Sequence, residues 1–314
     1  MFCNLQEEFT YFYIISYIKG DEIVSKELKD LRNLKYYEVT KDNPVIIKLE
    51  PFTRKKLYHY TNKKSAKSIL SNNCFWVTRS DYLDDKKEIK YMYELLGGVI
   101  GYLEKSRDSY DIGIEGQYVI FEAIIKALEG IRETYRDSTP IIDAHIYLLS
   151  LTENKNSKYL LENYAGEHGV VFEFVNETNT NDLINNQNIF DKNRVPILCG
   201  KVVYDPKKQL IILIEDINEF YNEIIDNCIT IDGCVNLNEE IVDTIKTALH
   251  LKMINYSLFF KHKKFEKEEE CRVAFIVGDN CSNEIIKHRQ RENKTIPYIE
   301  AEFRKESLNK VSYR

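Results

Sequence analysis

The feature that most constrains the fold is residues 57–88, LYHYTNKKSAKSILSNNCFWVTRSDYLDDKKE, where the pattern changes from strand to helix and back. Leu57-Tyr58-His59-Tyr60 is a β-prone run, and Phe75-Trp76-Val77-Thr78 predicts a second strand. Between them, Thr61 or Asn62 can cap a helix whose apolar side is formed by Ala66, Ile69 and Leu70. Asp84 and Asp85 can start a further helix. This close alternation predicts an α+β fold.

The remaining chain continues the same irregular alternation. Amphipathic helices are predicted at 84–96, 117–135, 157–164, 210–225 and 239–260, and strands at 141–152, 169–175, 197–204, 271–277 and 297–303. Gly97-Gly98 predicts a loop or helix break, and the Asn- and Asp-rich residues 176–195 predict a mobile surface loop. We therefore expect one main α+β domain over 51–314, with a mixed or split antiparallel sheet flanked by amphipathic helices. Residues 1–50 are expected to be an N-terminal extension packed on it.

Composition excludes several classes of protein. A hydrophobic fraction of 43% over 314 residues is enough for a packed core. The net charge of −6 gives no general attraction to nucleic acid or to an anionic membrane, although a local basic groove stays open. The seven cysteines are scattered without a CxxC, which predicts reduced thiols in the cytoplasm and no structural zinc site. The apolar segment Phe9–Ile18 is too short to span a bilayer.

Two polar constellations are candidates for chemistry. His59 and Tyr60 are neighbours on a predicted strand, so their side chains point to opposite faces and are not expected to enter the same cleft. One of them is therefore expected to be structural. Residues 261–272, KHKKFEKEEECR, precede a core strand. If that strand begins early, Glu268, Glu270 and Arg272 share one face, where a carboxylate beside a guanidinium can orient a hydroxyl or stabilise a developing cation. The alternative is a charged, solvated loop.

Two further groups have simple structural explanations. Ser150-Leu151-Thr152-Glu153, followed by Tyr164 and Gly169, is a polar strand end of the kind that often borders a pocket. Asp84, Asp85 and Glu88 could bind a cation, but they also suit the positive N-terminus of a helix. The sequence has no P-loop, no GxGxxG after a strand, no HExxH and no GxSxG.

In this order, these segments resemble the domain-of-unknown-function 2971 family of bacteria. The resemblance spans residues 55–280. Two positions depart from the family pattern, since Asp84 stands where Asn is usual and Leu161 stands near the usual Trp. The matching motifs are LYHYT at 57–61 with Ser68-Ile69-Leu70, Trp76, LDDKKE at 83–88, Ser150-Leu151-Thr152-Glu153 with Tyr164 and Gly169, and Lys261 through Phe265 to Glu268, Glu270 and Arg272.

The opening also resembles the His-Tyr-Glu type of ADP-ribosyltransferase, which implies an NAD-consuming enzyme, with NAD as substrate and no metal. His59 would contact a ribose hydroxyl and Glu270 would hold the ribose 2′-hydroxyl, with Glu268 as a further catalytic residue. Trp76 or Tyr82 would pack on the nicotinamide. The cofactor-binding residues implied in this way are Tyr60, Trp76, Arg79, Tyr82 and Arg272, of which Arg272 or Arg79 would hold the pyrophosphate.

Three functions therefore stay open. The first is an ADP-ribosyltransferase-like enzyme, an effector in bacterial conflict or phage defence, with protein, nucleic acid or water as acceptor. The second is a non-catalytic sensor that binds a nucleotide-type small molecule or a protein. The third is a metal-dependent nuclease that uses Glu268, Glu270 and the acidic turn. The enzyme requires His59 and Glu270 on the walls of one cleft with an aromatic side chain between them. A binding module could have the same cleft with Glu270 tied in a buried ion pair to Arg272, and a nuclease needs several carboxylates within reach of a metal.

Overall fold

The computed structural model describes residues 52, 54–83, 89–110, 117–137, 144–175, 183–193, 195–228, 239–278, 285–291 and 293–313. Before residue 50 it describes four two-residue strands, in which β1 (Phe12–Tyr13) pairs with β4 (Lys48–Leu49) and β2 (Ser16–Tyr17) with β3 (Pro44–Val45). Most of the expected N-terminal extension, the Asp84-Asp85 turn and Glu88 lie outside the described residues. The extension therefore stays a prediction.

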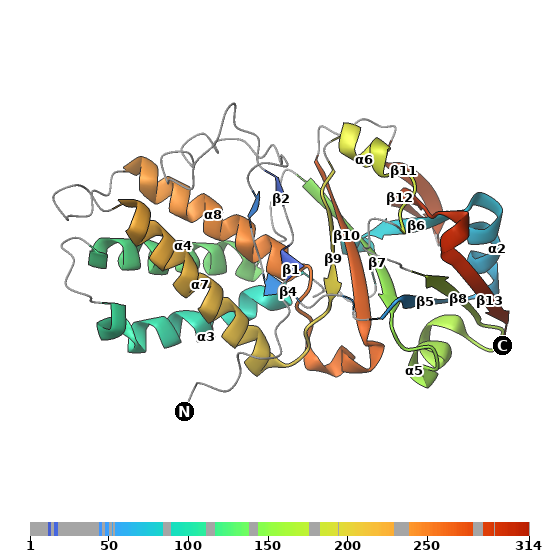
Figure 1. Ribbon diagram of the computed structural model, residues 1–314, viewed down its shortest axis with the longest axis horizontal. Coiled ribbons are helices and arrows are strands. Elements are labelled where there is room, and N and C mark those ends of the chain that lie inside the picture. Colours follow the sequence, from blue (N-terminus) through green and yellow to red (C-terminus); the bar gives the residue numbers. More distant parts are fainter. Residues whose placement is uncertain are drawn as a thin grey trace.

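The fold is α+β, as expected, with an antiparallel nine-stranded sheet beside a group of long helices (Figure 1). Along the sheet the strands follow the order β11 (Lys287–Arg291), β12 (Lys294–Glu302), β6 (Cys74–Arg79), β7 (Ala144–Thr152), β5 (Lys56–Thr61), β8 (Val170–Val175) and β13 (Leu308–Tyr313). The other edge of β7 pairs with β10 (Glu270–Gly278), which in turn pairs with β9 (Ile197–Lys201).

The sheet splits at β7, which is the feature that positions the site. On one edge of β7, β6 pairs with Tyr147 and Leu148, whereas β5 pairs only with Thr152. β5 and β6 diverge around Ser150, between these two pairings. The capped helix α2 (Lys63–Asn72) connects them, and the Asn62 side chain accepts a hydrogen bond from the Ser65 amide, as one of the two predicted caps. The predicted split sheet is therefore present.

Four long helices cover one face of the sheet. They are α3 (Tyr91–Lys105), α4 (Gln117–Asp137), α7 (Pro206–Cys228) and α8 (Glu239–Ser257), and they share one apolar core with Leu148, Leu198 and Ala274 of the strands. The stripe predicted in α4 faces this core. A second core on the opposite face contains Phe75, Phe172 and Phe275, with Ala66 and Ile69 of α2. Alternate residues of the central strands therefore belong to different cores.

Shorter elements complete the chain between these layers. They are η1 (Ser80–Tyr82), η2 (Arg107–Tyr110), α5 (Lys158–Leu160), the π-helical η3 (Leu161–Ala165), α6 (Gln187–Lys192), η5 (Lys263–Glu268) and η6 (Lys305–Ser307). No helix in the described part of the chain is long and apolar enough to cross a membrane.

Three local predictions were wrong. Helix α3 continues through Gly97 and Gly98 because the flanking Leu96 and Val99 are buried in the core shared by the helices. Glycine also allows close packing there, since a Cβ on Gly97 would lie 3.2 Å from the Arg132 guanidinium and one on Gly98 3.2 Å from Leu210. The predicted loop at 176–195 is described over 183–193 and at Val195, and there it contains α6 and is anchored by Leu183, Ile184 and Phe190 in the second core, while 176–182 lie outside the described residues. Strand β10 begins at Glu270, so Glu268 precedes it.

Candidate functional site

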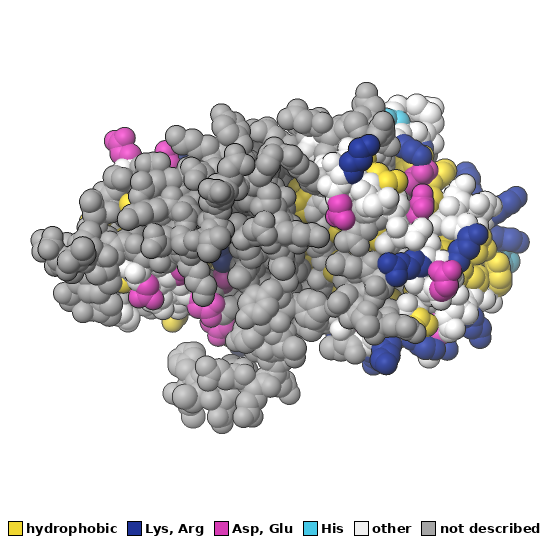
Figure 2. All heavy atoms as spheres, turned by 45° about the horizontal axis from the view of Figure 1, so that its top comes forward, with side chains coloured by type: hydrophobic (Ala, Val, Ile, Leu, Met, Phe, Trp, Pro, Cys, Tyr) yellow, Lys and Arg dark blue, Asp and Glu magenta, His cyan; other side chains and the backbone are white. Residues whose placement is uncertain are grey.

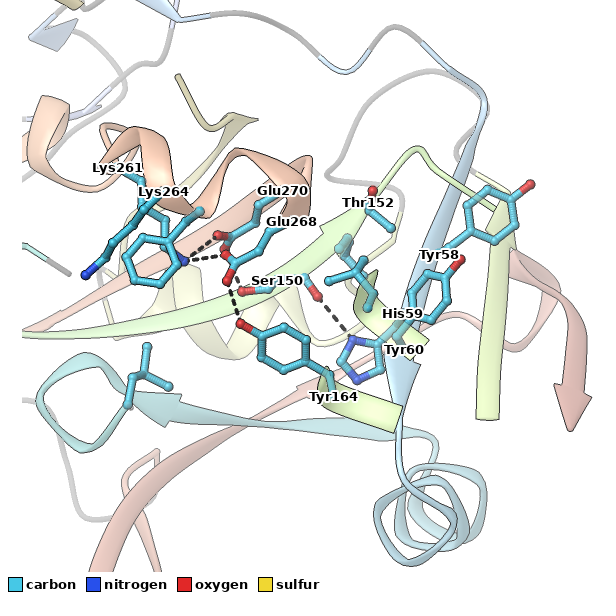
Figure 3. A pocket seen from close by; sticks show the side chains of 14 residues that line it. Tyr58, His59, Tyr60, Ser150, Thr152, Tyr164, Lys261, Lys264, Glu268 and Glu270 are labelled. Atoms are coloured by element: carbon cyan, nitrogen blue, oxygen red, sulfur yellow. Dashed lines mark hydrogen bonds and ion pairs between the residues drawn. The ribbon is translucent and has the colours of Figure 1, made fainter. Parts of the chain in front are cut away.

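A pocket of about 450 Å³ opens at the split of the sheet. Its walls come from β5, the end of β7, the α5–η3 segment and η5, which are far apart in the sequence (Figure 3). The lining residues are Tyr58, His59, Tyr60, Leu83, Ser150, Leu151, Thr152, Leu160, Tyr164, Lys261, Lys264, Phe265, Glu268 and Glu270. The predicted imidazole and both predicted carboxylates therefore line one pocket.

Glu270 is the most tightly held of these residues. It is 4% exposed, and its Oε1 accepts hydrogen bonds from Ser150 Oγ (2.5 Å) and Arg272 Nε (2.9 Å). Its Oε2 accepts from Arg272 Nη2 (2.8 Å) and Lys261 Nζ (3.3 Å). A carboxylate has about four acceptor positions, and these four donors occupy them. Burial alone would raise the pKa of Glu270, but Arg272 and Lys261 outweigh burial and lower the pKa to about 2.

Glu268 reaches the same place by a different backbone route. It ends η5, and Glu269 then adopts a left-handed conformation (φ 45°, ψ 48°), which turns the chain into β10. Both carboxylates consequently contact Lys261, although Glu268 is not on the strand. Glu268 Oε2 accepts from Lys261 Nζ at 2.6 Å, and Oε1 accepts from the Tyr164 hydroxyl at 2.5 Å. These two bonds leave acceptor positions on Glu268 unused among the described residues.

The buried charges of the site balance. Lys261, Glu268, Glu270 and Arg272 are each less than 7% exposed, and their two positive and two negative charges compensate one another. Burial and the neighbouring Glu268 carboxylate raise the pKa of the Tyr164 phenol, which therefore stays protonated and donates. Lys264 is exposed at the pocket wall and adds a positive charge, with its ammonium over the Phe265 ring. The pocket wall therefore offers a ligand both a carboxylate, at Glu268, and an exposed ammonium, at Lys264.

His59 closes the split from the side of the second core. Its ring packs edge-on against Phe75 (centroids 5.2 Å apart), and its Nδ1 lies 3.1 Å from the carbonyl oxygen of Ser150. A carbonyl only accepts, so Nδ1 carries the proton and Nε2 has the lone pair in the neutral ring. Burial lowers the pKa of His59 more than the Ser150 carbonyl raises it, which keeps the ring neutral near pH 7.

Tyr60 has a structural task beside the pocket. Its hydroxyl donates to the Asn154 carbonyl (2.8 Å) and accepts from the Ser157 amide (3.1 Å), which ties the loop after β7 to β5. The prediction that His59 and Tyr60 could not both enter one cleft was wrong, because β5 borders the split and both residues line the pocket, although Tyr60 also has a structural task.

Four of the predicted cofactor-binding residues do not line this pocket. Trp76 packs on Tyr298, with ring centroids 4.9 Å apart. Arg79 forms a two-point ion pair with Asp81 and lies over the Tyr82 ring. Arg272 is 1% exposed beneath Glu270. These residues are engaged elsewhere, and their roles toward NAD stay predictions.

Sequence reasoning left Lys261 and Lys264 without a role. Both lie in the segment KHKKFEKEEECR. The sequence feature that could have indicated their role is Phe265, because the ammonium groups of both lysines lie over its ring. Ser150 and Tyr164 were recognised as a polar strand end and its neighbour, but their link to the two carboxylates depends on tertiary contacts. Within the described ranges, no three His, Cys, Asp or Glu side chains converge as metal ligands would.

Comparison with known proteins gives one match. No curated protein and no solved structure matches this chain. Residues 161–273 match a family model described as protein of unknown function (DUF2971). This segment contains Tyr164, Lys261, Glu268, Glu270 and Arg272, whereas His59 and Ser150 lie outside it. The resemblance to the domain-of-unknown-function 2971 family is thereby confirmed over the part of the chain that supplies the carboxylate side of the pocket.

Proposed function

We propose that the pocket binds NAD and that the protein is an ADP-ribosyltransferase-like, NAD-consuming enzyme. One observation carries the proposal: His59 from β5 and the Glu268–Glu270 pair from the η5–β10 junction, more than 200 residues later, line the same pocket. A pocket of about 450 Å³ with tyrosine, leucine and phenylalanine walls falls within the range usual for nucleotide-sized ligands.

The reaction breaks the bond between the ribose C1′ and the nicotinamide nitrogen. The electron pair leaves with nicotinamide, and a nucleophile, either water or an acceptor group, forms the new bond to C1′ and loses its proton. Positive charge develops on the ribose in the transition state, so an ionised carboxylate nearby stabilises it. Glu268 and Glu270 are the two carboxylates in the pocket wall.

The two carboxylates have different capacities for this task. Glu270 is fully occupied by Ser150, Arg272 and Lys261, so a ribose hydroxyl can reach it only by displacing the Ser150 hydroxyl. Glu268 has unused acceptor positions, with Tyr164 and Lys261 as its partners. We therefore assign the ribose contact to Glu268 and a positioning role to Glu270, and we assign the phosphate contact to Lys264, which takes the place of the predicted Arg79 and Arg272.

Nicotinamide release tests the proposal directly. The protein is incubated with NAD, with and without cell extract, and released nicotinamide is quantified by chromatography. Glu268→Gln should lower the rate by about 100-fold or more, because the developing positive charge loses its nearest carboxylate. Glu266→Gln, an exposed neighbour outside this pocket, is the matched control and should keep the full rate. Absence of nicotinamide release in both conditions, or full activity of Glu268→Gln, would contradict the proposal.

A second candidate, a non-catalytic nucleotide-binding sensor, is favoured by the saturation of Glu270. A carboxylate whose charge is compensated by two cations stabilises a developing cation weakly, and it suits binding better than catalysis. NAD or ADP-ribose that raises the melting temperature without any nicotinamide release would select this candidate. The nuclease reading has no supporting observation among the described residues, and roles in bacterial conflict or phage defence stay predictions.

A further inference from the structure

Charge is distributed unevenly along the chain and over the molecule. Residues 54–81 contain seven Lys and Arg and one Asp, and residues 285–313 contain seven Lys and Arg and four Glu. Together the two segments have a net charge of +9, although the whole chain has a net charge of −6. These two segments meet where β6 pairs with β12. Figure 2 shows many Lys and Arg side chains spread over this end of the molecule, with Asp and Glu side chains among them. A local surface can therefore attract a polyanion although the whole protein is acidic.

The edge hairpin β11–β12 carries a row of cations on one face. In its register, Lys287 lies opposite Tyr298, Arg289 opposite Ile296 and Arg291 opposite Lys294, so the four basic side chains share one face. Successive members on β11 are two residues apart, which is about 7 Å. Lys287, Arg291 and Lys294 are exposed, and we call these four residues the hairpin row.

Arg289 is fixed within the hairpin row. Its guanidinium lies over Trp76 and Tyr298, 5.7 and 5.6 Å from the ring centroids, and its Nη2 donates to Thr78 Oγ1 at 2.8 Å. None of its contacts among the described residues is with a carboxylate. Burial and the like charge of Arg291 lower the pKa of Arg289, though a guanidinium stays charged at physiological pH. Lys287 pairs with Glu300 at 2.5 Å, and at such exposure a phosphate can replace this ion pair at little cost.

We propose that the hairpin row binds single-stranded nucleic acid through its phosphates. β12 is bonded to β6 only from Tyr298 to Glu302, so the part of the hairpin that carries Arg289, Arg291 and Lys294 is a two-stranded ribbon, and a duplex is therefore the competing ligand in the test below. None of the large exposed apolar side chains lies on β11 or β12, and a membrane-binding surface needs such side chains. A single line of cations matches a single phosphate backbone.

The hairpin row lies on the same sheet face as the pocket. Tyr298 pairs with Thr78, and Thr78 pairs with Leu148, two residues before Ser150. Three strand spacings of about 4.8 Å separate β11 from β7, which is about 14 Å. The hairpin row is closest to the pocket at Lys287, and Arg289 and then the paired Arg291 and Lys294 lie progressively farther from Ser150 along the strands. The proposal does not depend on NAD chemistry, because it is tested by binding alone.

The test measures binding of a fluorescent single-stranded oligonucleotide by anisotropy over a range of salt concentrations. The triple variant Lys287→Gln, Arg291→Gln, Lys294→Gln should bind at least 10-fold more weakly at low salt. Its slope of log affinity against log salt should be shallower by about 2, since each lost contact to a single strand removes about 0.7.

The matched control removes the same number of charges from the opposite face. This control is the triple variant Lys63→Gln, Lys64→Gln, Lys67→Gln, which changes three exposed lysines of α2, the helix that packs on the second core. Its affinity for the oligonucleotide should stay within about threefold of the wild-type value at moderate salt, because screening limits the range of the electric field of these lysines. The proposal is overturned if the full-length wild type does not bind the oligonucleotide at low salt, if both triple variants lose affinity equally, if a duplex of the same sequence binds more tightly, or if vesicles of anionic lipid compete for the row.

Discussion

Removal of the Arg272 guanidinium tests how the site is held together. In Arg272→Leu, Glu270 loses the bonds to Nε and Nη2 and keeps Ser150 and the more distant Lys261, and the Leu258 carbonyl loses its bond from Nη1. Breaking one partner of a buried ion pair leaves the other charge uncompensated and costs about 3–5 kcal/mol. The lowering of the Glu270 pKa from 4.5 to about 2 corresponds to about 3 kcal/mol, which agrees with that range.

The same argument fixes the pH dependence. The folded pKa of Glu270 lies below its unfolded value, so its contribution to stability is present above about pH 4.5 and is lost as pH falls toward 2. In Arg272→Leu the folded pKa rises and that contribution disappears. The difference in unfolding free energy between wild type and variant should therefore be largest near neutrality and shrink at about pH 3.

Urea unfolding followed by circular dichroism measures both quantities. The double variant Glu270→Gln, Arg272→Leu removes the uncompensated carboxylate and should recover at least about 1 kcal/mol relative to the single variant. A single variant that loses less than about 1 kcal/mol near neutrality, or a deficit that stays constant on acidification, would refute the account of Glu270 as a charge held by Arg272.

Two further predictions concern the backbone and the imidazole of the site. In Gly169→Ala the new Cβ would lie 2.4 Å from the Ala165 Cβ at the end of η3, so we expect the free energy of unfolding to fall by about 1–3 kcal/mol. In the control Gly101→Ala, inside α3, the new Cβ meets nothing within 4 Å, so this variant should be neutral or stabilising. Thermal unfolding of both variants checks this, and equal effects would contradict it. The folded pKa of His59 is lowered by burial, so the unfolded chain takes up the proton first and stability should fall as pH drops through about 6.5. His59→Gln should reduce that loss of stability, measured as the difference between melting temperatures above and below this pH. His250, whose pKa is also lowered by burial, should supply the loss that remains. An unchanged pH profile would show that His59 is not desolvated.

Local patterns were enough to predict most of the elements. The stripe in α4, the cap at Asn62 and the runs that became β5, β6, β7, β8 and β10 depend on contacts between residues close in sequence, which periodicity records directly. The errors occurred where distant residues decided. Gly97 and Gly98 stay helical because the flanking Leu96 and Val99 are buried against the neighbouring helices, and Leu183, Ile184 and Phe190 are held in the second core.

The sequence by itself determined which polar residues are present and that His59 and Tyr60 point to opposite faces of a strand, because that alternation follows from backbone geometry. It also recorded the basic character of residues 285–313. Only the tertiary structure decided that β5 and β6 diverge at Ser150 and that Lys261 joins Glu268 to Glu270. It also decided that Glu270, in contrast to Glu268, has all its acceptor positions filled. The reason is that the donors lie on elements separated by up to 120 positions in sequence, and their directions are fixed only when the sheet has formed.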